Sequence, residues 1–335
     1  MILGVMKRVK ALVLFSGGLD SQLVVKILKE QKIEVVALHF ILPFIASCFA
    51  DTSYISNFCQ VEKVPLKFVD CRKGKFFFEY LKIIKKPKFG YGKGLNPCLD
   101  CRIFILKKAK AMIEKKLTPK TKIGPLVADF IASGEVLGQR PMSQTRRALK
   151  LIEKEAKLEG KILRPLSAKL LEETEIEKKE LIDRERLYAI SGRQRLPQIE
   201  LAKKFGLKNY PTPAGGCLLC DKEFAKRLKT MLENFKDINE NDAELLKLGR
   251  HFWQYFPRQS ASSPRLSASA NETSAVIVVG RNHQENLKIK KLAKRGDILI
   301  EPENIPGPTT LIRGQGVSRE IIKKAEDLTK KYSKK

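Results

Sequence analysis

The sequence of 335 residues contains no apolar run long enough to cross a membrane, and no internal repeat is evident in it. Its first residues, Met1 to Lys7, are too few and too soon charged to form the hydrophobic core of a secretion signal. We therefore expect a cytoplasmic protein without a membrane partner. Since 43% of the residues are hydrophobic, the chain can bury a core, and a disordered protein is excluded.

Acidic residues are scarce relative to basic ones. The chain has 37 Asp and Glu against 65 Lys and Arg, which gives a formal net charge of +28. A charged thermophilic surface raises Lys and Glu together, and here the acids do not keep pace with the bases. Because a positive field of this size attracts polyanions, the composition favours a nucleic acid, RNA or DNA, as partner.

Apolar segments typical of strands alternate with helical patterns in the first part of the chain. This alternation predicts a doubly wound α/β domain with a mostly parallel sheet, in which ligands bind at the carboxyl ends of the strands. The strands are expected at residues 9–15, 35–40, 66–69, 127–132 and 162–166. The segments 149–208 and 221–253 are mostly helical and charged in pattern.

A second, small α/β domain is predicted near the C-terminus. Its strands are expected at 275–279, 297–300 and 309–312, with a helix at 285–292. A segment rich in Ser, Ala and Pro precedes it and has the composition of a flexible linker. We therefore divide the chain into an α/β domain over residues 8–220, a helical extension over 221–256, a linker over 257–271 and a small domain over 272–330.

The Walker pattern for binding phosphates is absent, because no Lys follows the glycines of the segment Ser16-Gly17-Gly18-Leu19-Asp20-Ser21. This segment nevertheless stands between a predicted strand and a predicted helix, which is the setting of a phosphate cradle. The glycines let the backbone approach an anion, and the two serines add hydroxyl donors. Asp20 would repel a bare phosphate, so its presence indicates Mg²⁺ between the carboxylate and a polyphosphate. The segment resembles the loop of the ATP pyrophosphatase superfamily, whose members split ATP between the α and β phosphates and adenylate a substrate oxygen.

Four of the seven cysteines form two pairs with the same spacing, Cys98 with Cys101 and Cys217 with Cys220. In a reducing compartment a disulfide framework is not expected, and two such pairs predict a soft-metal site. Cys98 and Cys101 open a helical pattern, where the helix dipole is expected to lower the pKa of both thiols. The remaining three, Cys48, Cys59 and Cys71, are interpreted as unrelated buried cysteines.

The paired cysteines are compatible with three kinds of chemistry. All four thiolates could hold a structural zinc ion in a closed tetrahedron. Three of them could hold an iron–sulfur cluster that leaves one iron open for the sulfur of a substrate. In the third interpretation, Cys98 or Cys101 works with Cys217 as a persulfide carrier and a resolving thiol.

A second motif makes the resemblance more specific. It runs from Gly134 to Gln139 as Gly-Glu-x-Leu-Gly-Gln and is followed by Ser143-Gln144-Thr145. This motif is similar to one of the tRNA 4-thiouridine synthase family, which also opens its catalytic domain with a Ser-Gly-Gly-x-Asp-Ser loop. The family's Leu-Arg-Pro-Leu segment matches residues 163–166. Together these matches cover residues 8–220 in the family's order.

The resemblance implies an adenine nucleotide alpha hydrolase-like fold that binds ATP and Mg²⁺. The ATP-binding residues it implies are Ser16, Gly17, Gly18, Leu19, Asp20 and Ser21, with Gly134, Glu135 and Gln139 lining the pocket for the nucleotide or the target base. Cys217 stands where the family's sulfur-transferring thiol is expected. Relatives that make 2-thiouridine and 2-thiocytidine hold a 4Fe-4S cluster on a Pro-Cys-x-x-Cys pair and a distant cysteine, an arrangement that Cys98, Cys101 and Cys217 fit.

The N-terminal RNA-binding modules usual in that family, and its sulfur-carrying rhodanese module, are not recognised in this sequence. In their place, the segments 279–286, 296–297 and 306–310 resemble a short NFACT-type RNA-binding domain. Arg281 and Arg313 are the candidates for binding tRNA phosphates there.

These observations lead to one hypothesis and its alternatives. The predicted function is that of an ATP-dependent tRNA sulfurtransferase that makes 4-thiouridine, with Asp20, Cys98, Cys101 and Cys217 as catalytic residues. Its partners are tRNA and a sulfur donor, which is a cysteine desulfurase, sulfide or a carrier protein. The alternatives are a 2-thiouridine or 2-thiocytidine synthetase, another tRNA-modifying ATP pyrophosphatase that forms an amide or attaches lysine, and a non-catalytic RNA-binding protein that holds zinc and ATP.

Overall fold

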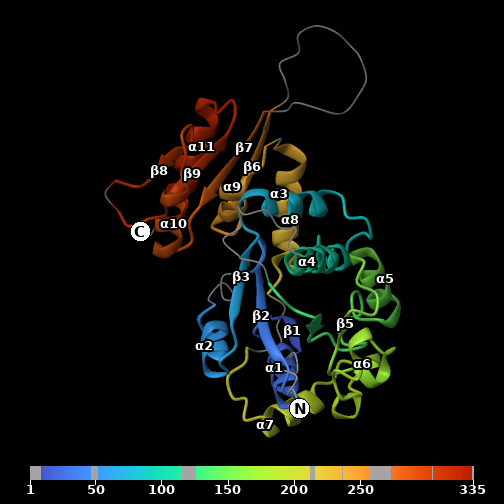
Figure 1. Cartoon of the computed structure of the whole chain (residues 1–335). Helices are drawn as coiled ribbons and strands as arrows, with labels where there is room; N and C mark the ends of the chain where they lie inside the picture. Colours follow the sequence, from blue (N-terminus) through green and yellow to red (C-terminus); the bar gives the residue numbers. More distant parts are fainter. Residues whose placement is uncertain are drawn as a thin grey trace, which may run out of the picture. The chain divides into compact units, whose positions relative to one another are not determined.

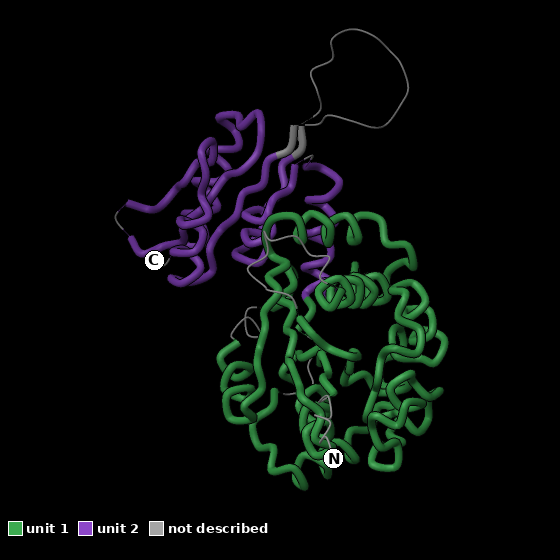
Figure 2. The backbone as a smooth tube through the Cα atoms, in the orientation of Figure 1, with its two compact units in different colours: residues 1–217 green, residues 218–335 purple. Residues whose placement is uncertain are grey.

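The computed structural model describes residues 9–46, 52–114, 126–211, 216–235, 237–256, 273–303 and 305–333. The chain divides into two compact units, Met1–Cys217 and Leu218–Lys335 (Figure 2). The predicted linker over 257–271 lies outside the described residues. Within the described ranges, no helix is both long and apolar enough to cross a membrane.

A five-stranded parallel sheet forms the centre of the first unit (Figure 1). Its strands are β1 (Lys10–Leu14), β2 (Glu34–Ile41), β3 (Leu66–Asp70), β4 (Phe130–Ser133) and β5 (Ile162–Leu163), in the spatial order β3-β2-β1-β4-β5. All pairings are parallel, which confirms the predicted doubly wound α/β class. The order reverses between β1 and β4, and in such sheets the ligand crevice opens at the carboxyl ends of the strands at this reversal.

Helices cover the sheet of the first unit. They are α1 (Leu19–Glu30), α2 (Ser53–Val61), α3 (Gly74–Lys85), α4 (Cys98–Ile113), α5 (Arg146–Ala156), α6 (Glu175–Lys178) and α7 (Leu196–Lys204), with 3-10 turns η2 (Ala168–Leu170) and η3 (Arg184–Arg186). Apolar side chains of α1, α2 and α7 form one core with Ala11 and Val13 of β1. On α1 the buried residues Leu19, Leu23 and Ile27 recur at helical spacing, because one face of the helix lies on the sheet.

The second unit is built around a four-stranded antiparallel sheet. Its elements are η4 (Leu218–Cys220), α8 (Lys222–Asn234), α9 (Glu240–Leu245), β6 (Arg250–Phe256), β7 (Thr273–Val279), α10 (His283–Leu292), β8 (Ile298–Ile300), β9 (Thr310–Gly314) and α11 (Arg319–Tyr332), with the strand order β6-β7-β9-β8. Side chains of β7 alternate between the two faces. Ile277 packs in the core that includes Ile321 of α11, and Val278 packs in the core that includes Ile289 of α10.

Three predictions about local structure need correction. The helical pattern expected over 221–253 ends at α9, and the strand β6 follows, because this aromatic segment pairs with β7 along its whole length. The segment 149–208 is helical only in part, since short turns and loops connect α5 to α7. The fourth strand begins at Phe130, three residues later than expected, because Asp129 instead accepts a hydrogen bond from the backbone of Lys10 at 2.9 Å.

Candidate nucleotide and thiol site

The glycine loop connects β1 directly to α1, which is the setting that its motif requires. Gly17 has a φ of +79°, and a Cβ there would lie 2.6 Å from side-chain atoms of both Tyr54 and Ile55, so no other residue fits. The loop is closed by its serines. The backbone N–H of Gly18 lies 3.3 Å from the hydroxyl of Ser16, and the hydroxyl of Ser21 donates to the carbonyl of Gly18 at 2.8 Å.

The loop that follows β4 approaches the start of α1. A Cβ on Gly134 would lie 2.8 Å from backbone atoms of both Asp20 and Ser21, so only glycine allows this approach. Gln139 donates from Nε2 to a carboxylate oxygen of Asp20 at 3.1 Å. Three residues that the sequence assigns to one nucleotide site, Asp20, Gly134 and Gln139, therefore lie together at the carboxyl ends of β1 and β4.

Glu135 lies in the same loop but is 3% exposed and engaged in ion pairs. Its Oε2 accepts from Nε of Arg164 and from the hydroxyl of Ser133, each at 3.1 Å, and its Oε1 lies 3.5 Å from Nε of Arg102. Burial raises the pKa of this carboxyl, but Arg164 and Arg102 more than offset that effect, so the net pKa is lowered and the group is ionised. The carboxylate thus fixes the loop after β4 to β5 and α4.

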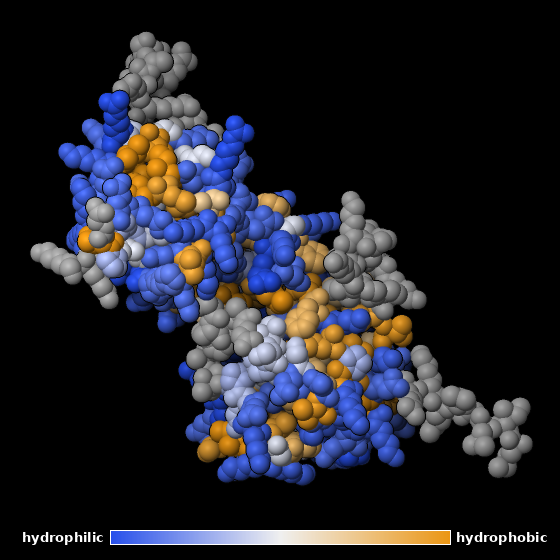
Figure 3. All heavy atoms as spheres, turned by 90° about the vertical axis from the view of Figure 1, so that its left-hand side faces the viewer, coloured by the Kyte–Doolittle hydropathy of each residue, from blue (hydrophilic) through white to orange (hydrophobic). Residues whose placement is uncertain are grey.

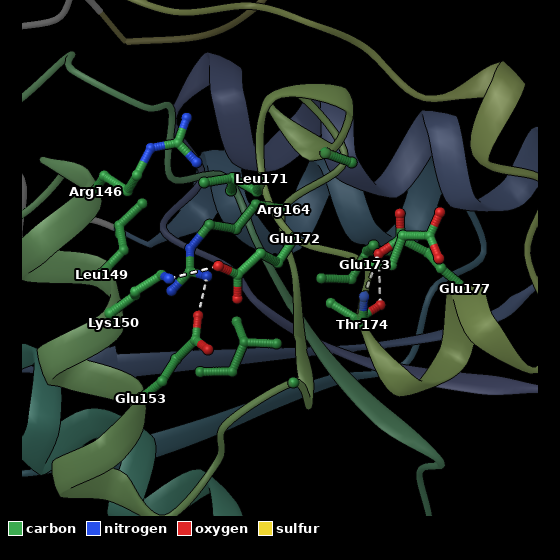
Figure 4. A pocket seen from close by; sticks show the side chains of 14 residues that line it. Arg146, Leu149, Lys150, Glu153, Arg164, Leu171, Glu172, Glu173, Thr174 and Glu177 are labelled. Atoms are coloured by element: carbon green, nitrogen blue, oxygen red, sulfur yellow. Dashed lines mark hydrogen bonds and ion pairs between the residues drawn. The ribbon is translucent and has the colours of Figure 1, made fainter.

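Arg164 of the Leu-Arg-Pro-Leu segment is itself a structural residue. It is 3% exposed, and its Nη1 contacts the Glu153 carboxylate on α5 (Figure 4). Arg164 and Glu153 line a small polar cavity of about 80 Å³, beside the surface pair Lys150–Glu172 and the helix cap that Thr174 and Glu177 form. Charges of both signs line this cavity, and the charged side chains pair mainly with one another, so the lining does not favour an ion of one sign.

Arg195 is a site residue that was not predicted. Its Nη2 lies 3.4 Å and 3.5 Å from the two carboxylate oxygens of Asp20. A sequence pattern could have found it, because a Ser-Gly dipeptide follows an apolar segment three times in this unit. The first two begin at Ser16 and Ser133, and the third, at Ser191, opens the segment that ends in Arg195.

The thiols of the first unit gather at the same edge of the sheet. Cys98 and Cys101 open α4, and the hydroxyl of Tyr80 on α3 donates to the sulfur of Cys101 at 3.3 Å. Burial raises the pKa of Tyr80, and the charges of Cys101, Cys217 and Cys71 raise it further. Cys71 directly follows β3.

Cys217 reaches this edge through its backbone. It forms an isolated antiparallel bridge with Ile45, which lies just beyond β2. Cys220 is the last residue of η4 in the second unit. Cys59 and Cys71 are buried, as expected, and Cys48 lies outside the described residues.

The expected lowering of the Cys101 pKa is wrong in direction. Burial raises the pKa of this thiol, and the Tyr80 hydrogen bond and Arg102 offset only part of the increase. The pKa of Cys71 is raised to about 12, chiefly by burial and then by Asp70. Of the groups that act on Cys101, the Tyr80 hydroxyl does most to favour the thiolate.

The cysteine sulfurs are ligands of the type that zinc and iron–sulfur clusters require. Among the described residues, however, no three side chains of His, Cys, Asp or Glu are arranged as a metal site. The metal site predicted for Cys98, Cys101 and Cys217 and the transfer of sulfur between these cysteines both stay predictions.

In the second unit, the prediction for Arg313 is wrong. This residue is 4% exposed, and its guanidinium donates to Asp242 at 2.8 Å and to Asp297 at 2.6 Å, so it holds the unit together and is not available to phosphates. Arg281 is half exposed and forms an ion pair with Glu285. Hydrophilic side chains cover most of the face that Figure 3 shows, in keeping with the high content of charged residues.

Comparison with protein families gives one match. Residues 270–335 match the family model of the NFACT protein RNA-binding domain, which confirms the resemblance inferred from the sequence. The match covers β7, β8, β9, α10 and α11, and β6 adds a strand to the same sheet from outside it. No curated protein matches the chain.

Solved structures give distant likenesses. The U34-tRNA thiolase NcsA from Methanococcus maripaludis with its 4Fe-4S cluster is 16% identical, with a TM-score of 0.33, and the match covers 72% of this chain and 70% of that chain. A 4-thiouridine synthetase in complex with RNA and ATP is 17% identical, with a TM-score of 0.38, over 71% of this chain and 52% of that one. A predicted tRNA methyltransferase subunit from Methanocaldococcus jannaschii is 16% identical, with a TM-score of 0.30, over 46% of this chain and 67% of that one.

This chain thus spans about half the length of the matched 4-thiouridine synthetase. All three likenesses are low in identity and TM-score, so the functional proposal below rests on the residues of this chain.

Proposed function

We propose that the protein is an ATP-dependent tRNA sulfurtransferase, which adenylates a carbonyl oxygen of a uridine and replaces that oxygen with sulfur. The observation that carries the proposal is that one edge of one sheet gathers a nucleotide loop and several thiols. Ser16 follows β1, the bridge to Cys217 lies beyond β2, and Cys71 follows β3. After β4, Glu135 is in ion-pair contact with Arg102, the neighbour of Cys101.

The first chemical step is activation of the uridine. Its carbonyl oxygen attacks the α phosphate of ATP, pyrophosphate leaves, and the base carries an adenylate that is a good leaving group. The loop Ser16–Ser21 and the N-terminus of α1 would bind the phosphates through backbone N–H groups and serine hydroxyls. Asp20 would hold the Mg²⁺ that accompanies the triphosphate.

The second step is transfer of sulfur from one thiol and release by another. The terminal sulfur of a persulfide on Cys217 attacks the activated carbon, and AMP leaves. Cys101 then attacks the sulfur of Cys217, so that the thiocarbonyl base departs and a Cys101–Cys217 disulfide remains. A dithiol reductant restores both thiols, and a cysteine desulfurase or a carrier protein that bears a persulfide then passes the next sulfur atom to Cys217. If sulfide is the donor, it attacks Cys217 in the Cys101–Cys217 disulfide instead, which forms the Cys217 persulfide and releases the Cys101 thiol without a reductant.

The alternative route uses a 4Fe-4S cluster on Cys98, Cys101 and Cys217, which would supply an open iron that carries sulfide. Anaerobic purification followed by iron, sulfide and zinc analysis separates the two routes. Iron and sulfide that are lost in both Cys98→Ala and Cys217→Ala would replace the persulfide route with the cluster. A protein that thiolates tRNA without bound metal supports the persulfide route.

We further propose C4 of uridine as the target, because the motif from Gly134 to Gln139 resembles that of 4-thiouridine synthases, and tRNA as the partner of the RNA-binding unit. The test is nucleoside mass spectrometry of tRNA incubated with the protein, ATP and a sulfur donor. 4-Thiouridine is expected. 2-Thiouridine or 2-thiocytidine would change the target position and keep the reaction class.

Two variants test the assigned roles. Asp20→Ala should abolish pyrophosphate release while tRNA binding stays within a few fold, and equal loss of both would contradict the role of the loop. Cys217→Ser should allow tRNA-dependent pyrophosphate release but yield no thionucleoside, with Cys59→Ser, a buried cysteine of α2, as the matched control. Pyrophosphate release without any sulfur transfer by the unmodified protein would instead favour an amide-forming or lysine-attaching enzyme.

A further inference from the structure

The guanidinium of Arg195 lies beside the carboxylate of Asp20, which belongs to the glycine loop. Arg195 and Asp20 are both largely buried, with side chains 20% and 18% exposed, and their closest atoms are 3.4 Å apart. That distance is long for a charge-assisted hydrogen bond, which is normally 2.7–2.9 Å. The Arg195–Asp20 contact is therefore an ion pair whose hydrogen bonds are incompletely formed.

The backbone fixes the position of Arg195. Leu137, just after β4, forms a parallel bridge with Ser191, and its carbonyl accepts from the N–H of Gly192 at 2.7 Å. Arg195 is the N-cap residue of α7, which packs on α1. The glycine loop, the loop after β4 and the segment before α7 thus meet at Asp20, and the last of them contributes the cation Arg195.

Buried polar atoms that lack a hydrogen bond are concentrated in two of these loops and at the start of α7. Among the described residues, ten buried side-chain atoms lack a hydrogen-bond partner, and six of them belong to residues 135–144 and 195–198. They include Nε of Arg195, Oε1 of Gln139 and both polar atoms of Gln198, which is 0% exposed and lies one helical turn beyond Arg195. Since buried polar groups in native proteins are nearly always paired, such a cluster indicates that a polar ligand or ordered water completes this site.

We propose that Arg195 binds a phosphate of ATP, and that its contact with Asp20 is the resting arrangement of the ATP-free protein. This inference rests on the proposed function, and it adds to the loop a cationic ligand that the Ser-Gly-Gly-x-Asp-Ser motif itself lacks. When the triphosphate enters, its oxygens compete with Asp20 for the guanidinium and offer the closer hydrogen bonds that the resting pair does not make. Asp20 is then left to the cation that accompanies the triphosphate.

The test is the affinity of the full chain for a non-hydrolysable α,β-methylene analogue of ATP, measured by titration calorimetry with Mg²⁺ and without tRNA. Arg195→Ala should weaken binding about tenfold to a hundredfold, as expected for loss of a hydrogen bond to a charged group. Arg195→Lys should restore part of the affinity, because it keeps the charge but loses the planar fork. Arg193→Ala, two residues earlier in the same segment, is the matched control and should stay within about twofold.

The outcomes separate this inference from the proposed function. If the unmodified protein binds the analogue and Arg195→Ala binds it equally well, the role of Arg195 is refuted and the proposed function stands. If the unmodified protein does not bind the analogue, both are refuted. Thermal unfolding without ligand tests whether the role of Arg195 is purely structural. In that case both Arg195 variants would have a lower melting temperature, and Arg195→Lys would restore no affinity for the analogue. That result would also overturn the proposal.

Discussion

The Tyr80–Cys101 hydrogen bond leads to a prediction that does not depend on the substrate. Tyr80 is 2% exposed, and its hydroxyl donates to the sulfur of Cys101 at 3.3 Å. The bond favours the thiolate over the thiol, since a thiolate is the better acceptor, and it therefore opposes the increase that burial causes in the Cys101 pKa. Tyr80→Phe removes one oxygen and leaves the ring in its edge contact with Phe104, at 5.5 Å between centroids.

The magnitude follows from the energy of such a bond. A hydrogen bond to a charged group contributes about 1.5–3 kcal/mol, and a tenfold change in population corresponds to about 1.4 kcal/mol. Sulfur is a weak, diffuse acceptor, so we take the lower end of the range. The population of the Cys101 thiolate at a given pH should therefore fall about tenfold in Tyr80→Phe.

The assay is the rate of alkylation of Cys101 by iodoacetamide across a range of pH, followed in the Cys101 peptide by mass spectrometry, because only the thiolate reacts. Tyr91→Phe is the matched control, since its hydroxyl donates to the carbonyl of Ile84 at 2.6 Å and not to a thiol. Equal rates in Tyr80→Phe and the unmodified protein would refute the reasoning. A faster rate in Tyr80→Phe would also refute it, because access rather than charge would then control the reaction.

Three further predictions concern stability and are checked by urea unfolding of the full chain. Gly134→Ala should lower the free energy of unfolding by about 1–3 kcal/mol, because its Cβ would lie 2.8 Å from the backbone of α1. The control Gly92→Ala should have little effect, because the atoms nearest to its Cβ would be 3.5 Å away. Similar effects of the two substitutions would contradict the close approach of Gly134 to α1. Arg313→Ala should lower the free energy of unfolding by about 3–5 kcal/mol, because it leaves Asp242 and Asp297 without their buried cation. The control Arg281→Ala removes a half-exposed ion pair and should lower it by less than about 1 kcal/mol. A small effect at Arg313 would show that its buried ion pairs are dispensable. His251 stacks on Trp253, the single tryptophan, and burial, followed by Arg227 and Arg281, lowers its pKa from 6.5 to about 3. The unfolded chain therefore binds this proton first, so stability is full above pH 6.5 and falls as the pH decreases towards 3, by about 1.5 kcal/mol between pH 6.5 and 5. Trp253 fluorescence should report this loss, and His251→Gln should remove it; an unchanged slope would exclude His251 as its source.

The architecture of the first unit was predictable because its signals are local. Each strand is an apolar run, and the residues that bind ligands in such folds directly follow the strands. Asp20, Gly134 and Gln139 belong to motifs of this kind, so the pattern that placed them after strands also placed them together. Arg195 follows the same rule, because it lies three residues after the dipeptide Ser191-Gly192, which also follows an apolar segment.

Other features depend on contacts between distant segments and could not be predicted. Arg313 is indistinguishable in sequence from a surface arginine until Asp242 and Asp297 are brought to it by the fold. The strand β6 lacks the strict alternation of apolar and polar residues that marks a strand in the sequence, and its pairing with β7 decides the outcome. Tyr80 lies in no motif, and only the packing of α3 against α4 brings its hydroxyl to Cys101.

The parallel sheet brings residues that are far apart in the sequence, such as Ser16 and Cys217, to one edge. Every strand of such a sheet ends at the same edge, so residues that follow different strands meet there without any sequence relationship between them. In this unit the ends of β1 and β4 carry the glycine loop with Gly134 and Gln139, whereas the segments after β2 and β3 hold Cys217 and Cys71. Under the proposed function, activation and sulfur transfer would therefore belong to different strands of one sheet. Changes around Tyr80 and Cys71 should consequently impair sulfur transfer and spare pyrophosphate release, whereas changes around Gly134 should impair both, because sulfur can replace only an oxygen that has already been adenylated.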